Sequence, residues 1–268
     1  MDGCGFAAPT IGAAPRMAGI TPTEGETLMR SSPSVSVLAS DYGFHPSILP
    51  LNKSLRPSAL TLRLTLDIEW DPPDPARALS NLESDLRDHH CRGPVQYHVH
   101  GASRSWTPKV RGRWLGVEPS LALAHLIEHV MIDAVAFVTG LERVSGVTGA
   151  HQNSERRFDV YVESPDYPVG LLARYVGIAW VLTLLQRGSL DSAGARTLPV
   201  ARLIYNLRPN SLDPSRAAEE VGMDEADALE VLERLEAAGF TRRYEYAVNL
   251  SGTPYFRVLS DGARASPT

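Results

Sequence analysis

The segment from Pro119 to Thr139 constrains the fold most, because it is apolar around most of the circumference of a helix. No polar stripe along it is wide enough to face water, and this predicts a buried helix. Ser120 is expected to cap the start of the helix, and Gly140 is expected to end it. Other elements must surround such a helix, so the sequence predicts a folded domain built on it.

Within this apolar segment, residues 125–129 read H-L-I-E-H. Positions four apart share one face of a helix, so His125 and His129 are expected to reach the same metal ion. Glu128 flanks that face, where a carboxylate can take a proton from a metal-activated water. Polar groups inside an apolar helix need partners, which favours a zinc (Zn2+) site over the alternative of polar residues at an exposed helix end.

A tetrahedral zinc ion held by two histidines and a water needs one more protein ligand, usually a carboxylate. Glu163, at the end of an expected strand over residues 157–163, is our candidate. Its alternative is an exposed carboxylate at a strand end. Asp133 shares the histidine face but lies about 12 Å of helix rise from His125, so orienting an imidazole suits it better than ligation.

The other patterns predict an α+β fold class, with a mixed sheet packed by the helix of the H-x-x-E-H sequence. Alternating residues predict strands at 60–68, 95–100 and 157–163, and helices are expected at 76–89 and 168–186. We assign these elements to one metallohydrolase-like domain over residues 56–188. Residues 1–55 are rich in Ala, Gly, Pro, Ser and Thr and are expected to form a flexible leader.

Residues 196–262 are expected to form a winged-helix-like module, with helices at 200–207, 214–221 and 224–238 before a hairpin at 244–259. In a DNA-binding module the third helix enters the major groove and needs cations for the phosphates. Here that helix carries Arg234 against six acidic residues: Asp224, Glu225, Asp227, Glu230, Glu233 and Glu236. Contact with a protein, or a role as a lid, is therefore expected in place of nucleic-acid binding.

The region from about residue 60 to residue 186 resembles the N-terminal region of cyanophycin synthetases. The matching segments are the strand at 62–67, residues 86–91 with their histidines and cysteine, the helix residues 124–130 with Asp133, and residues 158–163 followed by Val169 and Gly170. In some members this region is similar to pitrilysin-type metallopeptidases. The resemblance implies that His125, His129 and Glu163 bind zinc and that Glu128 is the general base.

The chain departs from that family at two places. The family's G-R-T-R turn is replaced by G-V-T-G at residues 146–149, and no G-x-x-x-x-G-K-[ST] phosphate-binding loop occurs. The chain is therefore not expected to be a synthetase.

Composition sets the remaining expectations. The 26 basic and 31 acidic residues give a net charge of −5, so no basic field predicts binding to nucleic acid or anionic lipid. Two cysteines and no run of eighteen apolar residues favour a cytoplasmic protein without a membrane span.

Two hypotheses follow from the sequence. One is a zinc-dependent metallopeptidase that cleaves a peptide or isopeptide bond. The other is a non-enzymatic adaptor or transcriptional regulator, with a structural or degenerate metal site and a protein partner at the winged-helix-like module. A homo-oligomer is compatible with either hypothesis.

Overall fold

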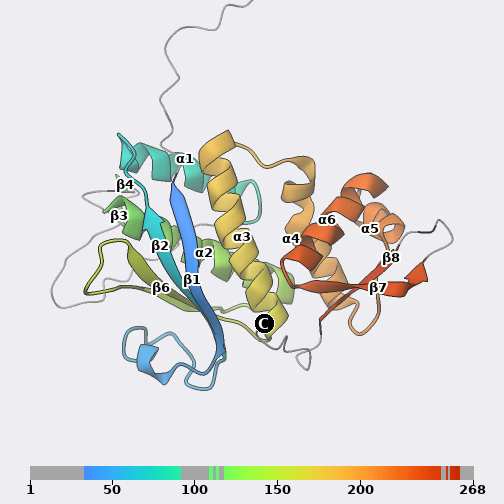
Figure 1. Cartoon of the computed structure of the whole chain (residues 1–268), viewed down its shortest axis with the longest axis horizontal. Helices are drawn as coiled ribbons and strands as arrows, with labels where there is room; N and C mark the ends of the chain where they lie inside the picture. The colour runs from blue at the N-terminus through green and yellow to red at the C-terminus, as the bar shows by residue number, and fades with distance from the viewer. Residues whose placement is uncertain are drawn as a thin grey trace, which may run out of the picture.

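The computed structural model describes residues 33–91, 109–110, 113–114, 118–248, 252 and 254–259. The predicted strand at 95–100 and residues 1–32 of the predicted leader lie outside these ranges. Figure 1 shows the elements in chain order: β1 (Ser34–Gly43), η1 (Pro46–Ile48), β2 (Thr61–Glu69), α1 (Pro75–Arg87), β3 (Lys109–Val110), β4 (Arg113–Trp114), α2 (Pro119–Thr139), β5 (Gly146–Ala150), β6 (Arg157–Glu163), α3 (Tyr167–Arg187), α4 (Ser192–Asn206), α5 (Pro214–Val221), α6 (Glu225–Ala237), β7 (Thr241–Val248) and β8 (Pro254–Val258).

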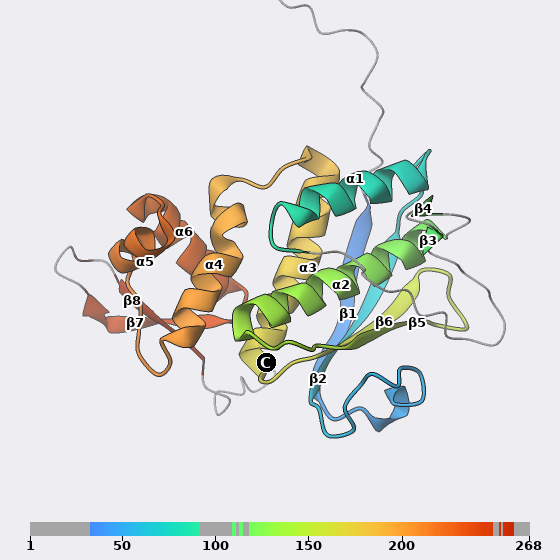
Figure 2. The same cartoon turned by 180° about the vertical axis from the view of Figure 1, so that it is seen from behind.

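Four strands form an antiparallel sheet in the order β1-β2-β6-β5, so β2 and β6 are central and β1 and β5 are edges. Helices α2 and α3 pack on the same face of this sheet (Figure 2). The alternate residues Leu62, Leu64, Leu66 and Ile68 of β2 are fully buried toward those helices. Because successive side chains point to opposite faces of a strand, the polar residues between these positions lie on the other face of the sheet. The strand can therefore lie at the centre of the sheet although every other residue is polar.

The prediction of mixed helices and strands of the α+β class is confirmed. Helix α2 has the predicted bounds, because its apolar residues repeat over five turns and Gly140 ends it at a positive φ of 71°. Its N-cap is Glu118 and not Ser120 as predicted: the Glu118 side chain accepts hydrogen bonds from the backbone N–H groups of Ser120 and Leu121. A glutamate is long enough to reach back over the first turn.

Two strands of the four-stranded sheet were not predicted, and neither were the short strands β3 and β4. β1 lies within residues 1–55, which we expected to be a flexible leader, and β5 lies where the resemblance places a turn of the family. Both are edge strands built largely from small residues, so their apolar alternation is weak. β1 and β5 are held by backbone hydrogen bonds to β2 and β6, and not by the burial of a large apolar face.

The C-terminal elements share the hydrophobic core of the sheet domain. One continuous cluster of buried apolar side chains runs from Leu62 of β2 through α2 and α3 to Val258 of β8. Helix α4 begins at Ser192, eight residues before the predicted start, because Asp191 caps it by accepting from the N–H of Gly194. The predicted domain boundary at residue 196 therefore falls inside a helix.

Helices α2 and α3 are also long and apolar enough to cross a membrane by length and composition. Most of each helix is buried inside the protein, which is typical of the core helices of a soluble protein. Their burial inside the protein therefore argues against a membrane span.

The close crossing of α2 and α3 yields a stability prediction at Gly177. A Cβ added there would lie 2.6 Å from Cγ of Met131 and 3.3 Å from the carbonyl oxygen of Ile127. Gly177→Ala should therefore lower the free energy of unfolding by about 1–3 kcal/mol, although alanine normally favours a helix over glycine by about 1 kcal/mol.

The control is Gly170→Ala in the same helix. There the nearest atom, Cβ of Leu62, is 3.4 Å away, at ordinary contact distance. This variant should be neutral or more stable. Urea denaturation of both variants measures the difference, and equal effects of the two substitutions would contradict the packing argument.

Candidate metal centre

The H-x-x-E-H residues lie in the second and third turns of α2, beyond the capped N-terminus. His125 and His129 are partly buried, and their Nε2 atoms lie 3.1 Å apart. Two nitrogen ligands of a tetrahedral zinc ion, each about 2.0–2.1 Å from the metal, are separated by about 3.3 Å. The spacing of the two rings therefore fits a shared metal ion, and it also fits a hydrogen bond between one protonated and one unprotonated nitrogen.

Glu128 is 3% exposed and lies between α2 and the edge strand β5. Its Oε2 accepts a hydrogen bond from the hydroxyl of Thr148 at 2.5 Å and lies 3.2 Å from Nδ1 of His125. Burial alone would raise the pKa of Glu128, but His125, His129 and Thr148 together hold it below its ordinary value. The carboxylate is thus kept ionised beside the histidine pair.

Strand β5 leaves room for this carboxylate at Gly146. A Cβ at that position would lie 2.9 Å from Oε1 and 3.1 Å from Cγ of Glu128, and 2.7 Å from the carbonyl oxygen of Tyr161. Gly146 and Thr148 pair with Val162 and Val160, so both lie on the face of the sheet that α2 covers. Glycine admits the side chain of Glu128, and threonine two residues later binds it.

Among the described residues, His125, Glu128 and His129 form the group of three whose potential ligand atoms all lie within 4.8 Å of one another. Two imidazoles and one carboxylate are a donor set typical of zinc and of other divalent transition metals. The group can hold a cation, with the carboxylate either as a ligand or as a neighbouring proton acceptor.

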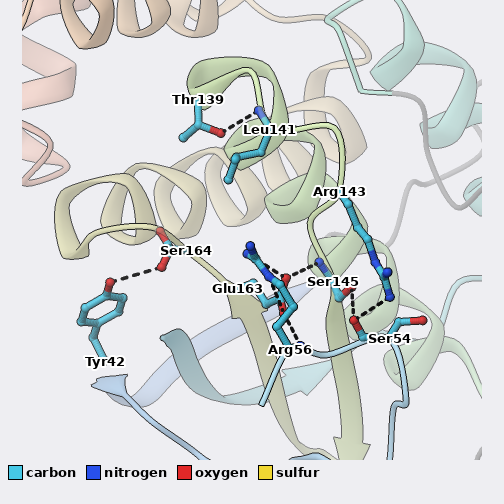
Figure 3. A network of polar contacts seen from close by, with 9 residues as sticks. All are labelled: Tyr42, Ser54, Arg56, Thr139, Leu141, Arg143, Ser145, Glu163 and Ser164. Carbon is cyan, nitrogen blue, oxygen red and sulfur yellow. Dashed lines mark hydrogen bonds and ion pairs between the residues drawn. The ribbon is translucent and has the colours of Figure 1, made fainter. Parts of the chain in front are cut away.

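Glu163, our candidate for the third ligand, is not part of this group. Its carboxylate is 1% exposed and accepts hydrogen bonds from the backbone N–H of Arg56 at 2.7 Å and of Ser145 at 3.3 Å. The guanidinium of Arg56 adds an ion pair, with Nη2 3.3 Å from Oε2 (Figure 3). These contacts fix the connection between β1 and β2 to the end of β6.

The alternation of β6 accounts for this placement. Phe158, Val160 and Val162 point into the core under the helices, so Tyr161 and Glu163 belong to the opposite face. Tyr161 indeed packs against a second small cluster on that face, formed by Ile48, Leu55 and Val147. Glu163 and the histidine pair therefore lie on different faces of one sheet.

Asp133 lies one turn farther along α2 than His129, near Cys91. Burial is the main cause that raises the pKa of the Cys91 thiol well above its ordinary value, and the carboxylate of Asp133 adds to it. One turn farther along the helix, Phe137 stacks on His90 at 4.5 Å between ring centroids. The proposed role of Asp133 in orienting a histidine stays a prediction.

No protein-family model matches the chain, and comparison with curated proteins finds no relative. The resemblance to cyanophycin synthetases therefore stays a prediction, and the geometry of the described residues carries the functional argument. The sequence analysis missed Gly146 and Thr148 as partners of Glu128. A G-x-T pattern shortly after the helix was the available signal, because small residues on a strand leave room for a buried side chain.

The contacts of Glu163 give a prediction that separates ligation from loop anchoring. In Glu163→Gln the neutral amide loses the ion pair with Arg56 and one of the two oxygens that accept backbone hydrogen bonds, so the free energy of unfolding should fall by about 1–3 kcal/mol. The bound metal per chain should stay the same, because the carboxylate faces the loop. Metal analysis and urea denaturation of the same preparation measure both quantities, and loss of metal would establish Glu163 as a ligand.

Proposed function

We propose that the chain is a zinc-dependent hydrolase that cleaves a peptide or isopeptide bond. The observation that carries this proposal is the pair of Nε2 atoms 3.1 Å apart beside a carboxylate that is buried and ionised. A site that only stabilised the fold would need ligands alone. A carboxylate held in place by its own hydrogen-bond donor, beside two imidazoles, is what a hydrolytic centre needs.

In this proposal His125 and His129 would hold a zinc ion, which would supply a Lewis acid able to lower the pKa of water toward about 7. The contact between Glu128 and Nδ1 of His125 selects the tautomer that presents Nε2 to the metal. That contact and the hydrogen bond from Thr148 both use Oε2. We assign proton acceptance to the carboxylate of Glu128, whose Oε2 lies beside His125 and whose Oε1 lies against Gly146.

The second candidate is an adaptor or regulator that acts through the C-terminal elements. Helices α4, α5 and α6 are followed by the β7-β8 hairpin, and Leu212, between α4 and α5, forms an antiparallel bridge with Phe256 of β8. This order supports a winged-helix-like module. A module of this kind binds either nucleic acid or protein.

Two arginines in the described part of this module are paired within the chain, and this argues against nucleic acid. Arg234 of α6 pairs with Asp191 and Glu230, and Arg243 of β7 pairs with Glu233 and Glu236. These guanidinium groups are thereby committed to carboxylates of the same chain and are not available to phosphates. If the module has a partner, we propose that the partner is a protein.

The first test of the hydrolase proposal is the metal content. The purified chain should hold one zinc ion, and His125→Ala or His129→Ala should lose it, because a single histidine at this site binds zinc weakly. His151→Ala is the matched control: this histidine lies 3.3 Å from Asp159 and outside the three-residue group. Zinc retained by the double variant at residues 125 and 129 would refute the site.

The second test separates catalysis from metal binding. Glu128→Gln keeps the size of the side chain but removes proton acceptance, so hydrolysis should fall by roughly 10²–10⁴-fold. Zinc should remain bound, because in this proposal Glu128 is the proton acceptor and not a ligand, and both histidines are unchanged. Mass spectrometry of a digested peptide library that includes β-linked aspartyl–arginine peptides gives the rate. Unchanged cleavage would remove Glu128 as the base, and no cleavage by the zinc-loaded wild type would favour the adaptor.

A further inference from the structure

The carboxylate of Glu128 is held on the side of strand β5. Thr148 donates a hydrogen bond to Oε2 at 2.5 Å, and Oε1 lies against Gly146, where an added Cβ would be 2.9 Å away. Gly146 and Thr148 are two residues apart, so both face helix α2, which packs on β5 (Figure 2). The strand therefore lies beside both oxygens of the carboxylate.

The hydroxyl of Thr148 is carried by a strand that is itself fixed. Thr148 pairs with Val160 of the central strand β6, and the side chain of Val160 is fully buried. The carbonyl oxygen of Gly146 accepts a hydrogen bond from Nδ2 of Asn52 at 2.6 Å, out of the loop between β1 and β2. Thr148 thus holds Glu128 from a position that neither α2 nor a metal ion determines.

Without this hydroxyl the carboxylate would lack a donor. Among the described residues, Oε2 would keep His125 as its partner, with Nδ1 3.2 Å away, and a buried carboxylate with too few donors is costly. The potential ligand atoms of His125, Glu128 and His129 all lie within 4.8 Å of one another. A released carboxylate is therefore close enough to join a metal ion that the two imidazoles hold.

We propose that Thr148 is a positioning residue that keeps Glu128 a proton acceptor and prevents it from becoming a ligand of the metal ion. This role rests on the hydrolase function proposed above. In a hydrolytic centre the base must stay off the metal, because a coordinated carboxylate takes the position that water needs. The hydrogen bond from Thr148 comes from outside α2, so a substitution can remove it without altering the helix.

The test compares the zinc affinities of Thr148→Val and Thr148→Ser. Valine has nearly the same shape but lacks the donor, so Glu128 should become a third protein ligand. The Kd for zinc should then fall by about 10–100-fold, the size of change that groups beside metal ligands usually cause. Serine keeps the hydroxyl and should keep the wild-type Kd.

Thr65→Val is the matched control. The hydroxyl of Thr65 in β2 donates to Oδ1 of Asp159 at 2.6 Å, which is also a bond from a threonine to a carboxylate. Neither residue belongs to the three-residue group, so the loss of this bond should leave the Kd for zinc unchanged.

Two further measurements tie the effect to Glu128. In the double variant of Thr148→Val and Glu128→Gln the gain in zinc affinity should vanish, because an amide is a poorer ligand than a carboxylate. With Co²⁺ in place of zinc, the visible absorption bands of Thr148→Val should differ from those of wild type and Thr148→Ser, because a ligand has changed. Thr148→Ala also lacks the hydroxyl and should behave like Thr148→Val, and circular dichroism checks that each variant is folded.

Weaker zinc binding by Thr148→Val would overturn the proposal, because it would mean that Glu128 is already a ligand that Thr148 supports. An unchanged Kd or an unchanged cobalt spectrum would overturn it as well. Neither measurement needs a substrate, so a wild type that binds zinc and cleaves no peptide would refute the hydrolase function alone. A chain that binds no zinc would refute both.

Discussion

A carboxylate buried between a helix and a strand is costly unless other groups compensate its charge, and the region around Glu128 is built to do so. His125 lies one turn before it on the same helix, and Thr148 reaches it from β5. Gly146 admits its side chain where any Cβ would collide. Strand β5 must therefore place Gly146 and Thr148 beside Glu128. This requirement fixes the position of α2 relative to the sheet.

The long apolar helices could be predicted from the sequence because their signals are local. The apolar residues of α2 repeat over five turns, and the proline, glycine and aspartate residues at the helix ends mark their limits within a few residues. The histidine pair followed from the same period, since residues four apart meet on any helix. Nothing outside α2 was needed to bring His125 and His129 together.

The parts that could not be predicted depend on contacts between distant segments. β1 and β5 are stabilised by pairing with strands far along the chain, and their small residues give no clear alternation. The face of the sheet on which Glu163 lies could have been predicted from the sequence. The valines of β6 already indicated that its even-numbered residues face the helices, so the odd-numbered Glu163 faces the other side. The ion pair between Arg56 and this carboxylate could not be predicted, since the loop that carries Arg56 has no recognisable pattern.

The shared core has a consequence for how the two halves respond to binding. Arg202 of α4 lies over the ring of Phe137 on α2, and one apolar cluster joins the sheet domain to the C-terminal helices. Elements that share a core unfold cooperatively. A ligand bound only by the native state adds its binding free energy to the stability of the whole unit. An ion on α2 would therefore protect α4, α5 and α6 from proteolysis without touching them.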